Sequence, residues 1–283
     1  MADVAVAHRR PLGAGARSFR MPGNGWQIAA VGYAAAFYAF LYGPIAIIAL
    51  LSFNKSEVTG LPFLGVTTHW YHVVFSRSDL MAALFNSIAL GVLSAAIATT
   101  IAFLLGLAFR RSFLGQQMVL GLVLLPIVMP GIIGGIVLLI FFGYLGIRPG
   151  LYTTVLVAHV NWVLPFVFLT LNARLQGLDP ALEEAAADLG ARTHQIMLRV
   201  ILPIIRPALI ATLLFAFSLS FDEFVRTLFV IGYDRTIPVV FWISIVERVA
   251  PELPAMAIIT ILISTAGALL GFAFSARSRL AEI

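Results

Sequence analysis

Residues 183–203 read EEAAADLGARTHQIMLRVILP, a polar stretch that separates two long apolar runs. Asp179 precedes it and is a favourable N-cap for a helix. Glu183 and Glu184 suit the positive end of that helix, and the three alanines that follow are strong helix formers with small side chains. Gly190 predicts a left-handed C-terminal stop. The stretch therefore predicts a short helix, a turn and a second helix that leads into the next apolar run.

This short helix has two interpretations. It is either a plain connector between two spans or a surface for another protein. A connector needs neither a capped start nor a face made of alanine, whereas a smooth alanine face can lie close against a groove on a partner. We therefore expect a docking helix.

The composition of the chain is that of a membrane protein. Hydrophobic residues make up 61% of the 283 residues and charged residues 11%, against about 25% charged residues in ordinary soluble domains. The chain has no cysteine, which excludes disulfides and thiolate metal sites. The net charge of +5 is explained below by membrane topology, so we expect the lipid bilayer as a partner and no nucleic acid.

Six apolar runs are long enough to cross a bilayer, at roughly 20 residues for each crossing. They lie near residues 27–53, 82–109, 117–145, 150–173, 207–231 and 253–274. The expected fold class is an all-α, polytopic membrane bundle of six transmembrane helices. The expected parts are an N-terminal arm at 1–26, a transmembrane domain at 27–274 that includes a loop at 174–206, and a tail at 275–283. The arm lacks the apolar core of a signal peptide.

Lysine and arginine are unevenly divided between the two sets of loops. Twelve of the 18 basic residues fall in the arm, near residue 110, in the loop at 174–206 and in the tail, and five fall in the opposite loops. Basic residues are enriched on the cytoplasmic side of membrane proteins. Both termini and the loop at 174–206 are therefore expected in the cytoplasm.

Helix-breaking residues interrupt the third and fourth spans. The third contains LLPIVMPGIIGG at 124–135, with Pro126 and Pro130, and the fourth contains Pro165. A proline removes a backbone donor that lipid cannot replace, so the freed carbonyls must face protein or water. The bend is either a kink with close helix contacts or a moving hinge, and the sequence leaves both open.

Several polar side chains lie within otherwise apolar spans. They are Asn86, Ser87, His159, Asn161, Asp222 and Glu223. Ionisable groups inside a membrane are costly and are functional candidates. Asp222 and Glu223 precede Arg226 by four and three residues, so either carboxylate can pair with that arginine along one helix face. The alternatives are a self-neutralised structural pair and a carboxylate that faces the path of a cationic solute.

Aromatic residues flank these polar positions, among them Trp162 and Phe221. Aromatic ring faces bind organic cations, but rings also face lipid or pack between helices. The candidates for a solute pathway are therefore Asp222, Glu223, Trp162, Asn161 and Phe221, with structural packing as the alternative for each.

The chain lacks the signatures of an enzyme. Its only lysine, Lys55, does not lie in a phosphate-binding loop of the GxxxxGK[ST] type. His69 and His72 form an H-x-x-H pair, but without further ligands an interfacial segment is the better interpretation. We expect no catalytic residue, no metal and no cofactor bound by this chain.

The spacing within the opening stretch resembles a known family motif. E-A-A, three residues, Gly190, nine residues and then Val200-x-Leu202-Pro203 resemble the EAA loop of permease subunits in ATP-binding-cassette importers of the MetI-like type, with valine for the usual isoleucine. The resemblance implies contact with a cytoplasmic ATPase through Glu184, Ala185, Ala186 and Gly190. The coupling set as a whole is Glu183, Glu184, Ala185, Ala186, Asp188, Gly190, Leu202 and Pro203.

Other segments resemble the spermidine/putrescine branch of this family. They are residues 70–111, LPFV at 164–167, SLSFDEFV at 218–225 and IPVVFWISIVERVAPELPAMA at 237–257. The resemblance implies a multi-pass subunit of the bacterial inner membrane. It also implies a paralogous second permease, two ATPase subunits that carry ATP and Mg²⁺, and an extracytoplasmic binding protein. Relatives in this branch also move ferric iron, phosphonates, thiamine, or opine-like and amino-acid-like solutes, so the solute stays open.

Two other functions compete with an importer. In an ion-gradient-driven transporter the intramembrane acids would be ion sites, but such proteins usually contain inverted repeats, and none is detected here. A membrane scaffold would bind a cytoplasmic partner without moving a solute. Only the importer requires both the docking helix and a pathway.

Overall fold

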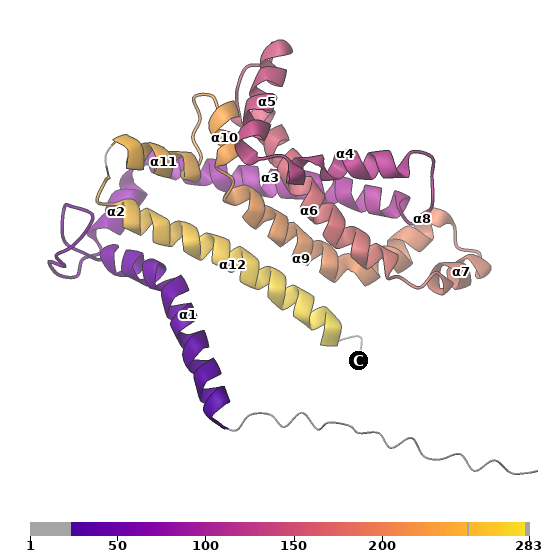
Figure 1. Ribbon diagram of the computed structural model, residues 1–283. Helices are drawn as coiled ribbons and strands as arrows, with labels where there is room; N and C mark the ends of the chain where they lie inside the picture. The colour runs from indigo at the N-terminus through magenta and orange to yellow at the C-terminus, as the bar shows by residue number, and fades with distance from the viewer. Residues whose placement is uncertain (1–23, 248, 281–283) are drawn as a thin grey trace, which may run out of the picture. The chain divides into compact units, whose positions relative to one another are not determined.

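The computed structural model describes residues 24–247 and 249–280, and helices dominate them (Figure 1). The α-helices are α1 (Asn24–Leu51), α2 (His69–Ser76), α3 (Ser78–Ala108), α4 (Gln116–Val128), α5 (Gly131–Tyr144), α6 (Leu156–Gln176), α7 (Ala181–Asp188), α8 (Thr193–Ile196), α9 (Leu202–Phe221), α10 (Val225–Val230), α11 (Ile237–Glu247) and α12 (Leu253–Leu280). Two π-helical segments, η1 (Leu151–Val155) and η2 (Met197–Ile201), lead into α6 and α9. Within the described residues, strand-like pairing is limited to the bridge between Asn54 and Val66.

The chain divides into two compact units, residues 1–47 and residues 48–283. In the first unit, α1 is apolar along its length and is long enough to be a candidate membrane span. Residues 1–23 of the predicted arm at 1–26 lie outside the described residues. Of the predicted tail at 275–283, residues 275–280 are helical, because α12 continues to Leu280.

The core of the second unit is formed where α3, α6 and α9 pack together. Ala95, Ala98 and Ala102 of α3 lie against Phe168 of α6 and Ala216 of α9, and all five are fully buried. Small side chains let helix backbones approach closely, which is the usual basis of helix packing in membranes. α12 packs on α9, and α4 packs on α6.

The second unit has two opposite ends, each marked by different short helices. Figure 1 shows α7 and α8 beyond one end of the α3–α6–α9 core, and α2 and α11 beyond the opposite end. We refer to these as the α7 end and the α2 end. Each of the long helices α3, α6, α9 and α12 runs between them.

The predicted third span is broken rather than gently bent. α4 and α5 meet at 113° across a short break. Pro130 immediately precedes α5 and can donate no backbone hydrogen bond to continue α4. The described residues thus contain five helices long and apolar enough to cross a membrane, or six if this broken pair counts as one span.

The predicted bounds of the fifth span, 207–231, are wrong at both ends. The candidate span runs from Thr193 to Phe221 through α8, η2 and α9, so it includes residues 193–206 of the predicted loop at 174–206. At the other end the chain leaves the helix at Asp222, and the short helix α10 follows. The reason is local, because the Glu223 carboxylate accepts the backbone amide of Arg226 at 2.8 Å and so starts the new helix.

Candidate functional site

The short helix predicted in the opening stretch is α7, and its two ends are built as expected. The Asp179 carboxylate accepts the amide of Ala181 at 2.9 Å, which satisfies a donor that the helix leaves free. Gly190 adopts the left-handed conformation, with φ +84°. The amide of Ala191 bonds the carbonyl of Ala186 at 3.0 Å, and that of Gly190 bonds Ala187 at 2.8 Å. These two bonds define a Schellman stop.

The surface of α7 is uncovered within the second unit. None of its residues is buried. Glu184, Ala185 and Asp188 are exposed, and Ala186 is half-buried. Leu189, which follows the helix, is 90% exposed. An exposed leucine beside a small-residue helix indicates a surface that another protein can cover.

The two glutamates of α7 have different partners. Glu183 is half-buried and forms an ion pair with Arg110, which follows the C-terminal end of α3. Glu184 points to the exposed side. The sequence predicts Arg110 only as one of the cytoplasmic basic residues; it does not predict the pairing with Glu183, because the two residues are far apart in the chain.

The motif's final residues, Leu202 and Pro203, lie in the first turn of α9. Leu202 is half-buried and Pro203 is exposed. The neighbouring Ile201 and Ile205 pack against Leu175 at the end of α6. This small apolar cluster anchors the loop between α6 and α9 to both helices.

The second candidate region centres on the pair Glu223 and Arg226, which are 7% and 4% exposed. The Arg226 guanidinium donates to the Glu223 carboxylate at 3.2 Å. It also lies 3.8 Å from the centre of the Trp162 ring, in cation–π contact. Because Arg226 occupies one face of Trp162, a solute cation cannot use that face.

Asp222 is not part of this ion pair. Its side chain is exposed, and its carboxylate accepts the Ser264 hydroxyl of α12 at 2.9 Å. Ser264 is eleven residues from Leu253 at the start of α12, or about 17 Å along the helix. Ser264, and with it the Asp222 carboxylate, therefore lies beside the middle of the apolar candidate span Leu253–Gly271.

A chain of buried hydrogen bonds crosses four helices next to these residues. Ser94 of α3 donates to Ser220 of α9 at 2.6 Å. The two ring nitrogens of His159 on α6 contact Ser220 and Thr227, each at 2.7 Å. Thr227 donates onward to the carbonyl of Glu223 at 2.9 Å. Because Thr227 has only one proton and gives it to the carbonyl of Glu223, His159 donates to Thr227 through Nε2.

The other pathway candidates have distinct positions. Phe221 is 1% exposed and stacks on Phe217, so it belongs to the packed core. Asn161 is exposed and, with Pro126 and Arg226, borders a small cavity of about 100 Å³ beside the α4–α5 break. Pro165 is buried inside α6. The structure therefore brings Asn161, Trp162 and Glu223 together around Arg226, and leaves Asp222 on the α12 side.

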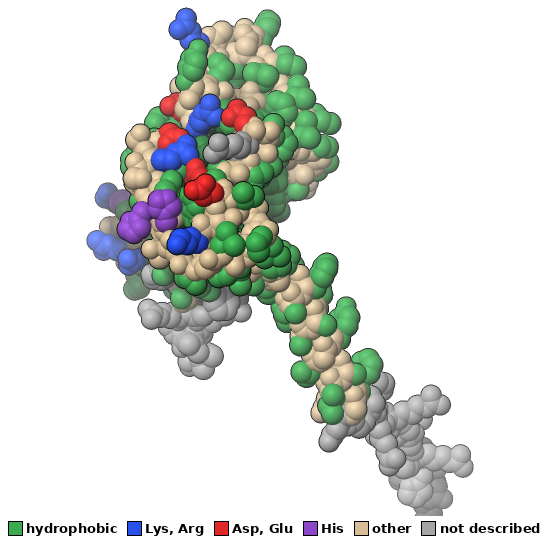
Figure 2. All heavy atoms as spheres, turned by 90° about the vertical axis from the view of Figure 1, so that its left-hand side faces the viewer, with side chains coloured by type: hydrophobic (Ala, Val, Ile, Leu, Met, Phe, Trp, Pro, Cys, Tyr) green, Lys and Arg blue, Asp and Glu red, His purple; other side chains and the backbone are tan. Residues whose placement is uncertain are grey.

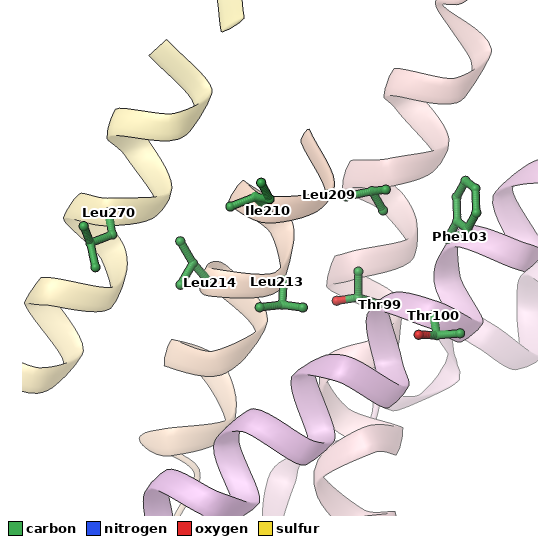
Figure 3. A pocket seen from close by; sticks show the side chains of 8 residues that line it. All are labelled: Thr99, Thr100, Phe103, Leu209, Ile210, Leu213, Leu214 and Leu270. Atoms are coloured by element: carbon green, nitrogen blue, oxygen red, sulfur yellow. The ribbon is translucent and has the colours of Figure 1, made fainter. Parts of the chain in front are cut away.

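A larger groove lies elsewhere, between α3, α9 and α12 (Figure 3). Its volume is about 450 Å³, and leucine, isoleucine and phenylalanine side chains line most of it. Thr99 and Thr100 contribute the polar atoms, as Figure 3 shows on α3. A wall of this kind has no charge to hold a cation, so the groove is not a candidate for such a site.

The α2 end carries a second set of charges. Figure 2 faces this end and shows basic, acidic and histidine side chains gathered on it. Arg77 bonds Asp79 at 2.6 Å and Glu252 at 2.5 Å, and so ties α3 to the start of α12. Its hydrogen bonds to Asp79 raise the pKa of Arg77 above the ordinary value. His69 and His72 are exposed on α2, and the described residues contain no cluster of three metal-ligating side chains.

Comparison with known proteins gives concordant results. A family model described as "Binding-protein-dependent transport system inner membrane component" matches residues 98–279. The chain is 37% identical over 235 residues to the spermidine/putrescine transport system permease protein PotC of Escherichia coli (strain K12), covering 82% of this chain and 88% of the relative. It is 34% identical over 244 residues to the putrescine transport system permease protein PotI of the same strain, covering 83% and 85%.

Solved structures share the fold. A chain from the crystal structure of a bacterial ABC transporter that imports the acidic polysaccharide alginate matches with a TM-score of 0.69 and 17% identity, covering 89% of this chain and 96% of that chain. A second structure of an alginate transporter, in complex with an alginate pentasaccharide-bound periplasmic protein, gives the same score. At this identity the likeness establishes the fold alone.

Proposed function

We propose that this chain, which belongs to the family of binding-protein-dependent transport system inner membrane components, lines the path of a small cationic solute. The chain is a multi-pass permease subunit of an ABC importer in the inner membrane, and a transport subunit rather than an enzyme. The proposed solute is a polyamine, the class that the names of its relatives specify.

The observation that carries this proposal is the exposed carboxylate of Asp222 beside the middle of the candidate span Leu253–Gly271. A charged side chain that faces lipid near the bilayer centre costs about 2.5 kcal/mol or more. Another protein or water must therefore cover this face in the assembled transporter. A second permease that encloses a water-filled path between the two subunits meets that requirement. In such a path, Asp222 would pair with an ammonium group of the solute.

The interactions of Glu223 support the choice of Asp222 as the pathway carboxylate. The Glu223 carboxylate forms an ion pair with Arg226, and both side chains are buried. We therefore assign the structural role to Glu223 and propose the pathway role for Asp222. Asn161 is the second polar candidate on an exposed surface, whereas Phe221 and Trp162 support the walls of the path by packing.

Energy would enter through α7. Two ATPase subunits would hold ATP and Mg²⁺, and closure of the ATPase dimer would push on the exposed surface of α7 and Leu189. Because Ile201 and Ile205 pack against Leu175, that push would move the adjoining ends of α6 and α9 together. The basic residues of the α7 end support its location in the cytoplasm. An extracytoplasmic binding protein would then dock at the α2 end.

The role of Asp222 is tested by comparing Asp222→Asn with Glu223→Gln. Each variant is expressed with the partner subunits in cells that lack other polyamine uptake, and uptake of radiolabelled spermidine and putrescine is measured per amount of permease. We expect Asp222→Asn to lower uptake at least about tenfold, the equivalent of one charge-assisted contact, at an unchanged protein level. Wild-type uptake by Asp222→Asn would refute the proposed role.

The control variant distinguishes a pathway role from a structural one. Glu223→Gln removes one charge of a buried ion pair and leaves Arg226 uncompensated, which is expected to cost about 3–5 kcal/mol of stability. We therefore expect less folded Glu223→Gln protein in the membrane. If this variant were instead stable and inactive, Glu223 rather than Asp222 would be the pathway carboxylate.

A further inference from the structure

The coupling helix α7 contacts a part of the chain that is distant in sequence. Its flanking segments connect it covalently to α6 and to α8. In addition, the Glu183 carboxylate in its first turn accepts the guanidinium of Arg110, which lies 73 positions earlier. None of the residues of α7 is fully buried, and its helix contacts include α8 and η2, the next segments of the same loop. The ion pair adds a contact to the end of α3, a distant part of the chain.

The ion pair is better shielded than an ordinary surface pair. The Arg110 and Glu183 side chains are 16% and 29% exposed, and salt screens partly buried pairs less than exposed ones. Both charges also suit their helices. Arg110 follows the negative C-terminal end of α3, and Glu183 lies at the positive N-terminal end of α7. The adjacent residues Arg111 and Glu184 are exposed.

A second bond joins the end of α3 to the same loop. The Gln176 side chain, at the end of α6, donates to the carbonyl of Phe109 at 2.9 Å. Phe109 is 7% exposed, and its ring packs edge-on against Phe168 of α6. The C-terminal end of α3 is thus held to the start of the coupling loop by Gln176 and to the coupling helix by Arg110.

We propose that Arg110 is a positioning residue that transmits movement of α7 to α3. The inference rests on the proposed action of an ATPase at α7. Without the ion pair, movement of α7 would reach the bundle along the chain, through α6 and α9. With it, the movement also reaches α3, a 31-residue helix that packs on both of those helices. At the far end of α3, Arg77 binds Glu252 beside α12, so movement of α3 would reach the α2 end.

The test uses the complete importer in proteoliposomes, with radiolabelled spermidine as the solute. It compares the single variants Arg110→Ala and Glu183→Ala with a double variant that exchanges the two charges, Arg110→Glu plus Glu183→Arg. Arg111→Ala is the matched control, because it removes the same charge from the neighbouring exposed position. The readout is solute transported per ATP hydrolysed. We expect each single variant to lower this ratio at least about fivefold, the lower range of coupling between sites. We expect Arg111→Ala to match the wild type and the exchanged pair to recover at least half of the loss.

Docking of the ATPase on the permease is measured separately, by crosslinking. The chain has no native cysteine, so Leu189→Cys can be crosslinked to cysteines placed on the ATPase in every variant. We expect equal crosslinking in all of them. An unchanged transport ratio in Arg110→Ala, or an exchanged pair no better than the single variants at equal yield of complex, would refute the role of Arg110. Failure of the otherwise wild-type chain to crosslink would refute docking at α7, and the inference about Arg110 would fall with it.

Discussion

Two pairs of adjacent acidic residues divide their roles in the same way. Glu183 binds Arg110 while Glu184 is exposed, and Glu223 binds Arg226 while Asp222 is exposed. Neighbouring side chains point in different directions, so one basic partner can engage only one member of each pair. One carboxylate of each pair thus forms an ion pair within the chain, and the other is the one that we propose meets a partner or a solute.

Gly190 provides the residue-scale prediction for coupling. Its φ of +84° disfavours every residue with a Cβ, although the space around it is open. Gly190→Val is expected to cost about 1–2 kcal/mol of backbone strain and to shift the end of α7. We expect solute transport per ATP hydrolysed to fall severalfold. The measurement is the same proteoliposome assay.

Gly115 is the control for strain alone. It has φ +85°, also in open space, but lies before α4 rather than after α7. Gly115→Val should therefore cost similar stability while its transport ratio stays at the wild-type value. Equal losses of coupling in both variants would show that Gly190 has no special role.

At the scale of elements, the broken third span is a close-packed junction. Cβ atoms added at Gly131 and Gly134 would contact Val225 or Arg226, and one added at Gly135 would come within 2.5 Å of the Phe229 ring. The glycines of α5 thus allow α10 to approach closely. Of the two interpretations of this bend, the structure supports close helix contacts; movement about Pro126, Pro130 or Pro165 stays a prediction.

Gly135→Ala tests this junction. The added methyl group would overlap Phe229 at three of its atoms, and overpacking of this kind costs about 1–3 kcal/mol. We expect a lower thermal unfolding temperature for the purified protein in detergent. Gly143→Ala on the same helix has nothing within 4 Å and should be neutral or slightly stabilising. A stable Gly135→Ala protein would mean that α5 and α10 are not held in close contact.

At the scale of the whole molecule, features that depend on local sequence were predictable. The spans that became α1, α3, α6 and α12 follow from apolar length, since a membrane requires about 20 such residues. The capped helix α7 follows from Asp179 and Gly190, whose effects act within one turn. The Glu223–Arg226 pair was also foreseen as an alternative, because it spans only three residues.

Features that depend on distant contacts were not predictable. The Arg110–Glu183 pair, the Ser94–Ser220–His159 hydrogen bonds and the Asp222–Ser264 contact each join residues on different helices. Sequence patterns identify polar residues on apolar helices but do not pair them. The 113° break between α4 and α5 likewise depends on how α10 packs, and prolines alone indicate only a bend.

The central claim is that this permease moves its solute only when an ATPase acts on it. The most direct measurement is uptake of radiolabelled spermidine into proteoliposomes that contain either this chain with the second permease alone or the complete importer with its binding protein and ATPase. We predict uptake that requires the ATPase and ATP hydrolysis, and none by the permeases alone, with or without an imposed proton gradient. Gradient-driven uptake by the permeases without the ATPase would contradict the account.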